Sequence, residues 1–283
     1  MKKVQEGWAA LNLEMPDRVP RTEYSAEFHW KLVQEVTGIR VDSNSTEELQ
    51  QRASNEFRKA WDYRLRCQQV PDAVNTTGVY ITLVSGLLEI FGWDILLMAL
   101  GMDPEGFGET ANRYAEWMQQ YFDALADCES PVVKVHDDIV WTSGPFVRPE
   151  WYRKYVFPNY KKFFAPLREA GKKIIFTSDG NYTQFVDDIA DCGVSGFVLE
   201  PTTDMKYVAE KYGKTHAFIG NADTRILLNG SKEEIYEEVK RCMDIGKKCP
   251  GFFMAVGNHI PSNTPVENAL YYNEVFEKLR KRC

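Results

Sequence analysis

Short apolar runs alternate with amphipathic segments through the second half of the chain. Each of five runs rich in β-branched and aromatic residues is followed by a segment whose apolar residues recur at helical spacing. This alternation is typical of βαβ units that build a parallel sheet. The predicted strands lie at 131–138, 172–180, 195–202, 214–223 and 250–260, and the predicted helices at 148–171, 182–193, 203–213, 231–246 and 265–282.

The first third of the chain has a weaker pattern. Residues 18–24 form a short predicted strand that ends at Glu23, and residues 25–38 form a predicted helix with Ser25 as its N-cap. Further helical sequence covers 45–63, and 71–83 is a second strand or a loop. Seven strands are therefore predicted, and the position of an eighth stays open.

Polar residues able to do chemistry follow the predicted strands at their carboxyl ends. In a parallel α/β barrel these ends share one face, where the active site forms, whereas in an open doubly wound sheet only those near the switch point meet. Five such ends in succession favour a (β/α)8 TIM-type barrel, regular or distorted, with an N-terminal helical extension. We expect one domain over 1–283, with the N-terminal strand and helices in 1–70 and the main barrel in 71–283. The polar residues at the strand ends are His136, Asp137, Asp138, Asp179, Glu200, Asn221, Asn258 and His259.

Each of these positions also has an ordinary structural explanation. Asp179 with Gly180 and Asn181 is a common turn or helix-cap sequence, and Glu200 before a proline fits a loop carboxylate. Asp137 and Asp138 would also suit a solvated loop. Their recurrence at successive strand ends favours the functional interpretation.

Composition and charge limit the class of protein and the cellular compartment that fit this chain. The net charge of −7 argues against a nucleic-acid binder, and six scattered cysteines without a C-x-x-C pair fit reduced cytosolic thiols. The N-terminus has no apolar signal segment. The apolar stretch 80–101 carries Glu89 and Asp94 and is interrupted by glycines, which predicts a buried helix or two rather than a membrane span. We expect a soluble, cytoplasmic protein.

Four blocks, at residues 136–163, 171–181, 220–239 and 257–272, resemble the uroporphyrinogen decarboxylase superfamily. That superfamily also contains corrinoid-dependent methyltransferases, which move methyl groups between small molecules and a cobalamin-binding protein. The decarboxylases carry an arginine-rich N-terminal segment that binds porphyrin carboxylates, and residues 18–30 of this chain contain no such segment. Without those cations many substrate carboxylates would stay unpaired. The resemblance is therefore nearest to the methyltransferase branch.

The zinc ligands of that branch do not carry over. Its members hold zinc through His-x-Cys at the strand end and a distant Cys, and here Thr177, Asp179 and Asn258 occupy or adjoin those places. Carboxylate and imidazole ligands also bind zinc, and they leave it more electrophilic than thiolates do. We therefore predict a metal held by Asp179, Glu200 and His259.

The resemblance and this ligand set together predict an O-demethylase-type methyltransferase. It would take a methyl group from a methoxylated, aromatic small molecule to the cobalt of a separate corrinoid protein, with zinc polarising the leaving oxygen. The direction of transfer stays open, and so does a homodimer. The predicted catalytic residues are Asp137, Asp138 and Asp179, and the predicted substrate contacts are Glu23, His136, Asn181, Asn221, Asn258 and Trp141.

Two alternatives belong to other classes. One is a decarboxylase-like lyase that acts on a carboxylated substrate without a cofactor. The other is a barrel that only binds its ligand, which the series of polar strand ends disfavours.

Overall fold

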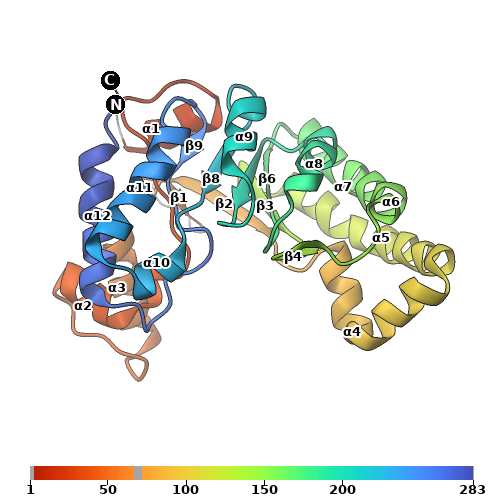
Figure 1. The fold of residues 1–283 in the computed structure, drawn as a ribbon, viewed down its shortest axis with the longest axis horizontal. Helices are drawn as coiled ribbons and strands as arrows, with labels where there is room; N and C mark the ends of the chain where they lie inside the picture. The colour runs from red at the N-terminus through yellow and green to blue at the C-terminus, as the bar shows by residue number, and fades with distance from the viewer. Residues whose placement is uncertain (1–2, 67–71, 283) are drawn as a thin grey trace. The chain divides into compact units, whose positions relative to one another are not determined.

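A computed structural model describes residues 3–66 and 72–282 of the chain (Figure 1). The chain forms two compact units. We call Asn75–Val208 the central unit, and Met1–Val74 together with Ala209–Cys283 the terminal unit. The predicted boundary between residues 70 and 71 falls outside the described residues, and a single barrel domain over 1–283 stays a prediction.

Parallel strands form the core of the central unit. They pair in the order β2 (Val74–Val79), β3 (Val132–His136), β6 (Lys173–Thr177) and β7 (Gly196–Leu199). Val133, Ile175 and Phe197 are fully buried, as expected for a parallel sheet covered on both faces. His136 is in register with Thr177, and Thr177 with Val198, so the carboxyl ends of β3, β6 and β7 meet at one edge. The predicted strand ends at His136, Asp179 and Glu200 are therefore neighbours.

Helices and one small hairpin complete the central unit. The hairpin pairs β4 (Val140–Trp141) with β5 (Gly144–Pro145) directly after β3. The helices follow the predicted segments, with one π-helical turn between α6 and α7. Their bounds are α4 (Leu83–Met102), α5 (Pro104–Asp127), α6 (Pro149–Trp151), η2 (Tyr152–Val156), α7 (Phe157–Glu169), η3 (Thr183–Phe185), α8 (Val186–Asp191) and α9 (Met205–Tyr212).

Helix α4 only partly matches its predicted environment. It bends at Gly92, whose φ of 71° is not helical, so two helical segments follow each other as the sequence suggested. The first segment is buried through Leu83 and Leu87, but the second exposes 61% of Met98 and 82% of Met102. By length and composition α4 could cross a membrane, and 33% of its most apolar window is buried. The prediction of a buried helix is thus wrong for the second segment.

The terminal unit combines a short parallel ladder with helices. Strands β8 and β9 pair through Phe218 and Phe252, and Arg21 in the extended segment 18–23 bridges to both Met254 and Tyr63. The predicted strand at 18–24 therefore exists as bridges rather than a full ladder. The elements are α1 (Lys3–Leu11), η1 (Ala26–Phe28), α2 (Trp30–Thr37), α3 (Glu47–Ala60), β1 (Leu65–Arg66), β8 (Ala217–Gly220), α10 (Thr224–Asn229), α11 (Lys232–Gly246), β9 (Phe252–Phe253) and α12 (Val266–Leu279).

The start of the predicted helix 25–38 differs from expectation. Ser25 adopts a left-handed conformation with φ of 62° and makes no side-chain cap hydrogen bond. A 3-10 turn follows, and α2 begins only after His29, whose ring nitrogen accepts the N–H of Leu32. The prediction of Ser25 as N-cap is therefore wrong, because an imidazole has taken that role.

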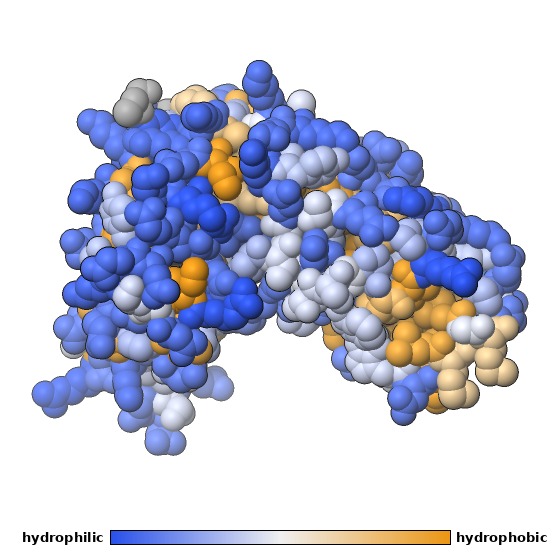
Figure 2. Space-filling view, in the orientation of Figure 1, coloured by the Kyte–Doolittle hydropathy of each residue, from blue (hydrophilic) through white to orange (hydrophobic). Residues whose placement is uncertain are grey.

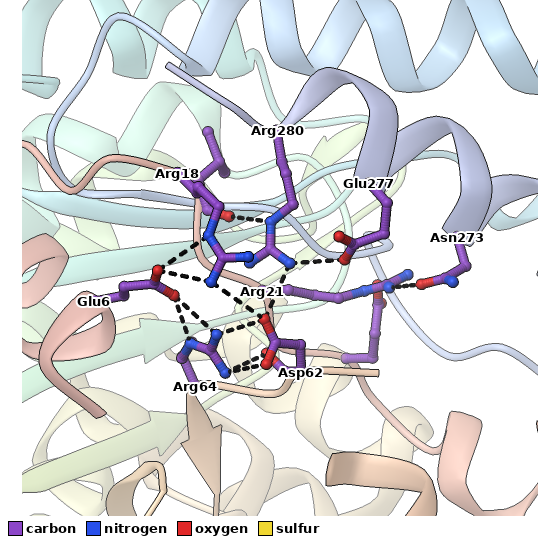
Figure 3. A network of polar contacts seen from close by, with 10 residues as sticks. Glu6, Arg18, Arg21, Asp62, Arg64, Asn273, Glu277 and Arg280 are labelled. Carbon is purple, nitrogen blue, oxygen red and sulfur yellow. Dashed lines mark hydrogen bonds and ion pairs between the residues drawn. The ribbon is translucent and has the colours of Figure 1, made fainter. Parts of the chain in front are cut away.

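A buried ionic network ties the terminal unit together (Figure 3). The guanidinium of Arg64, with 1% of its side chain exposed, donates to Glu6 at 2.8 Å and to Asp62 at 2.6 Å. Arg280 donates to Asp62 at 3.0 Å, and Arg18 donates to Glu6 at 2.8 Å. The network thus joins α1, the segment before β1 and the end of α12.

Candidate active site

A histidine and two carboxylates converge where β3 and β6 end. The Nε2 atom of His136 lies 3.4 Å from Oδ1 of Asp138 and 3.8 Å from Oδ1 of Asp179. One ligand atom from each residue lies within 4.8 Å of the others. The side chain of His136 is 12% exposed, whereas those of Asp138 and Asp179 are 42% and 53% exposed. The histidine of the cluster is therefore largely buried, and the two carboxylates are open to solvent.

The imidazole of His136 is held in one orientation by Tyr80. Nδ1 lies 2.9 Å from the backbone oxygen of Tyr80, so the ring donates its Nδ1–H there. The Tyr80 ring stacks on the imidazole, with 4.3 Å between centroids and 3° between planes. This arrangement turns Nε2 toward the two carboxylates, as a metal-binding histidine requires.

Backbone hydrogen bonds fix the carboxylates and the turn that carries Asp179. Oδ1 of Asp138 accepts the Asp179 N–H at 2.9 Å, and Oε2 of Glu200 accepts the Gly180 N–H at 3.0 Å. Gly180 has a φ of 90°, and a Cβ there would lie 2.6 Å from the carbonyl oxygen of Trp141. The turn therefore requires glycine, because a larger residue would push the hairpin away from the cluster.

Trp141 and Asn181 border the cluster in different ways. The indole of Trp141 is 47% exposed, and its carbonyl accepts the Asn181 N–H at 2.9 Å. The side chain of Asn181 accepts from both the N–H and the hydroxyl of Thr183, at 3.1 and 2.7 Å. Trp141 therefore presents an aromatic face, while the Asn181 side chain shapes the loop.

Asp137 has an anchoring position, although it is adjacent to both His136 and Asp138. It is fully buried and accepts the N–H groups of Leu83, Val84 and Ser85 at 2.6–3.0 Å, at the start of α4. The Tyr160 hydroxyl adds a fourth hydrogen bond at 2.6 Å. Burial raises the pKa of the Asp137 carboxyl, while these donors and the positive end of the helix act in the opposite direction. Of Asp137 and Asp138, only Asp138 reaches the open site.

Four predicted site residues lie in the terminal unit. Glu23 is buried, and its oxygens accept from Arg21 at 2.9 Å, Tyr272 at 2.8 Å and the Val256 N–H at 2.9 Å. Burial raises the pKa of the Glu23 carboxyl. The other three predicted residues have these environments: Asn221 is buried and accepts from Arg241 at 3.0 Å, Asn258 is half-buried after β9, and His259 is exposed with Nδ1 2.7 Å from the Ser25 hydroxyl.

Two functional positions were missing from the sequence prediction. Tyr80 directly follows β2, and His136 is the last residue of β3, so the rule that polar groups lie at strand ends would have found Tyr80. Tyr160 is a buried residue near the start of α7, and no sequence signal distinguishes it from a core tyrosine.

The charge of His136 gives a pH-dependent property to test. Burial lowers its pKa, but the nearby carboxylates of Asp179 and Asp138 outweigh burial, and the pKa is raised above 6.5. The ion cluster therefore stabilises the metal-free fold below pH 6.5, and this contribution is lost as the pH rises through the raised pKa. We expect NMR titration of the His136 ring to give a midpoint above 6.5 and Asp179→Asn to lower it. A midpoint that Asp179→Asn leaves unchanged would contradict this assignment.

The donor set fits a divalent metal. One imidazole nitrogen and two carboxylate oxygens are accepted ligands of zinc, and three protein ligands leave a position for substrate or water. The hydrogen bond from Nδ1 to a backbone carbonyl is the usual support of a metal-binding histidine. Asp179 was predicted as a ligand, and the group that the described residues bring within reach of one ion is His136, Asp138 and Asp179. The ligand roles of Glu200 and His259 stay predictions.

Comparison with known proteins identifies the family. The family described as Uroporphyrinogen decarboxylase (URO-D) matches residues 69–279, more than half of the chain. The chain belongs to the uroporphyrinogen decarboxylase family. The resemblance stated from the sequence blocks is thereby confirmed.

Curated members of the uroporphyrinogen decarboxylase family match over part of their length. The uroporphyrinogen decarboxylase of Carboxydothermus hydrogenoformans is 31% identical over 176 residues, which cover 62% of this chain and 49% of that protein. The enzyme of the same name from a strain of Thermus thermophilus is 28% identical over 167 residues, covering 59% and 47%. The chain thus spans about half the length of these relatives.

A solved structure establishes the fold of this uroporphyrinogen decarboxylase family member. The chain is similar to a methyltransferase from Methanosarcina mazei, with a TM-score of 0.64, 17% identity and coverage of 98% and 99% of the two chains. The predicted TIM-type α/β class is confirmed. The curated relatives carry the name of an enzyme, uroporphyrinogen decarboxylase, and the structural neighbour is named a methyltransferase.

Proposed function

We propose that the chain is a methyltransferase that passes a methyl group from a methoxylated aromatic molecule to the cobalt of a separate corrinoid protein. The supporting observation is the open cluster of His136, Asp138 and Asp179, which offers metal ligands beside exposed aromatic rings. The proposal includes a zinc ion at this cluster and a cytoplasmic location. The finer activity goes beyond what the family shows, because this chain covers only about half of the length of the curated relatives.

The charge of the site supports methyl transfer over porphyrinogen decarboxylation. Asp138 and Asp179 place two carboxylates beside the His136 imidazole, and the carboxylate of Glu200 after β7 accepts the N–H of Gly180, next to Asp179. A polycarboxylated porphyrinogen would meet repulsion there, whereas a cation would be attracted. A decarboxylase-like lyase remains the second candidate, since the relatives named uroporphyrinogen decarboxylase are the more similar in sequence.

The residues of the site have separate roles in this proposal. Nε2 of His136 and one oxygen each of Asp138 and Asp179 would hold the metal, which would supply Lewis acidity to the ether oxygen. The faces of Tyr80 and Trp141 would stack on the aromatic ring of the substrate. In the transfer the methyl–oxygen bond would break with both bonding electrons staying on the oxygen, which takes up a proton from solvent. The methyl group would form a bond to the cobalt of the partner protein with the electron pair that Co(I) supplies, so the cobalt ends as methyl-Co(III).

Zinc content and methyl transfer test the proposal together. We expect about one zinc per purified chain by plasma mass spectrometry. We also expect demethylation of 2-methoxyphenol with cob(I)alamin as acceptor, followed by the absorbance change to methylcobalamin. A chelator should remove the activity, and added zinc should restore it. Asp179→Asn keeps the shape but removes a charged ligand, so we expect zinc affinity to fall at least about 10-fold.

The matched control is Asp188→Asn, which removes a carboxylate paired with Arg153 at 3.1 Å on another face of the central unit. It should leave both zinc content and transfer unchanged. Conversion of uroporphyrinogen to coproporphyrinogen by the metal-free chain would refute the proposal in favour of the lyase.

A further inference from the structure

Two buried tyrosines of the continuous helix α6–η2–α7 donate hydrogen bonds to the residues on either side of Asp138. The hydroxyl of Tyr152 lies 2.7 Å from the carbonyl oxygen of Ile139, and that of Tyr160 lies 2.6 Å from Oδ2 of Asp137. Both tyrosines are fully buried, and burial raises the pKa of both hydroxyls, so they stay protonated and act as donors. One helix therefore binds both neighbours of Asp138.

The π-helical turn η2 places the two hydroxyls on the same face of that helix. Tyr152 and Tyr160 are eight residues apart, which in a continuous α-helix would leave their side chains about 80° apart around the axis. The π-helical turn runs from Tyr152 to Val156, between the two tyrosines, and takes in about one residue more than an α-helical turn. The offset thereby falls to about 20°. Both hydroxyls can then reach the segment 137–139.

The solvent-facing side of the same helix plays no part in this contact. Arg153 and Lys154, which lie between the two tyrosines, expose 47% and 54% of their side chains and pair with acidic residues of other helices. Many exposed apolar side chains of the central unit gather over α4 instead, as Figure 2 shows. The two tyrosine hydroxyls are therefore turned into the unit, where protein groups are their partners.

The segment 137–139 is held from its other sides as well. Each of its three N–H groups donates a hydrogen bond, at 2.8–3.2 Å, and the acceptors are, in order, the carbonyl of Thr177 and the hydroxyls of Ser85 and Ser178. These acceptors belong to the end of β6 and the start of α4. Tyr152 adds a bond to the carbonyl end of the segment, from the opposite direction, so the main chain on both sides of Asp138 is fixed.

The Asp138 side chain depends on this main chain for its direction. It is 42% exposed, so packing alone does not hold it, yet its Oδ1 lies 3.4 Å from Nε2 of His136 and accepts the Asp179 N–H at 2.9 Å. We propose that Tyr152 and Tyr160 are positioning residues that hold the Asp138 carboxylate beside His136 and Asp179. They touch neither metal nor substrate, and they act through the segment 137–139.

Zinc affinity gives the first test, and this test rests on the proposed function. Tyr152→Phe removes one oxygen and keeps the ring, so we expect zinc affinity to fall about 10-fold, as for the loss of a supporting hydrogen bond at a metal site. Competition with a fluorescent chelator measures the change. Tyr160→Phe should have a smaller effect, because three N–H groups still hold Asp137.

Amide hydrogen exchange, followed by NMR on the metal-free chain, gives a second test that needs no zinc. The Asp179 N–H donates to Oδ1 of Asp138, so its exchange rate reports how firmly that carboxylate is held. We expect Tyr152→Phe to speed this exchange at least about 5-fold. The side chain of Asp179 is 53% exposed, and an amide in such a turn exchanges by local opening. A loss of global stability alone would therefore leave its rate unchanged.

Tyr207→Phe is the matched control for both tests. It removes a tyrosine hydroxyl that lies 2.8 Å from Oδ1 of Asp187, a contact between α9 and α8. Zinc affinity and the exchange rate of the Asp179 amide should both stay at their wild-type values in this variant.

Two outcomes would overturn the inference. In the first, Tyr152→Phe leaves the exchange of the Asp179 amide at the wild-type rate. In the second, Tyr152→Phe lowers the urea midpoint of unfolding while zinc affinity stays unchanged, which would make the tyrosine a purely structural residue. A wild-type chain that binds no zinc would instead count against the proposed function, and the exchange rates would still decide the positioning role.

Discussion

Replacing Arg64 by methionine should lower the free energy of unfolding by about 3–5 kcal/mol. The substitution keeps a long apolar side chain but leaves Glu6 and Asp62 without their shared cation. Both carboxylates are largely buried, with 4% and 11% of their side chains exposed. Glu6 keeps its hydrogen bond from Arg18 and Asp62 keeps the one from Arg280, but both buried carboxylates lose their shared cation, so the loss should still be larger than for a surface pair.

Urea unfolding followed by circular dichroism would measure this effect. Lys59→Met serves as the matched control, because it breaks the pair of Lys59 with Glu56, whose side chains are about half exposed. That variant should lose at most about 1 kcal/mol. If Arg64→Met and Lys59→Met lost equal amounts, the network in Figure 3 would not be holding the terminal unit together.

The second large effect is expected for Asp137→Asn, at about 3–5 kcal/mol of unfolding free energy. An asparagine of the same shape would turn its N–H₂ group toward the donors of Leu83, Val84 or Ser85, and so leave buried N–H groups without an acceptor. It would also remove the negative charge from the start of α4. The first turn of that helix should therefore loosen.

The same substitution at Asp103 provides the control. Asp103 caps α5 at an exposed position by accepting the Gly106 N–H at 2.9 Å. Asparagine caps helices as well as aspartate does, so Asp103→Asn should change stability by less than about 0.5 kcal/mol. Equal, small effects at both positions would mean that Asp137 is free to act in the site, as the sequence interpretation had assumed.

Periodicity predicted the fold where local pattern and tertiary environment agree. The strands at β3, β6, β7 and β8 fall within their predicted ranges, because buried parallel strands need continuous apolar runs. The environment of Met98 and Met102 could not be predicted in this way. An apolar helix is equally consistent with burial in the core and with exposure to a partner, and the sequence does not say which surface covers it.

The candidate site was predicted by position but not by role. Asp179 and His136 were expected near one another because parallel strand ends meet, and in the central unit they do. The different environments of Asp137 and Asp138 depend on the start of α4, more than fifty residues earlier in the chain. A contact between segments so far apart in the chain cannot be predicted from the local sequence of either one.

The two aspartates after β3 also bear on how activity can change in this family. Asp137 binds the start of α4 through hydrogen bonds, and Asp138, the next residue, lies at the open site. The end of β3 is therefore followed by one structural side chain and one side chain of the site. A substitution at position 138 would change a group beside His136 at the open site, whereas one at position 137 would disturb the start of α4. The residue at position 138 can therefore be substituted while the hydrogen bonds of Asp137 keep the fold intact.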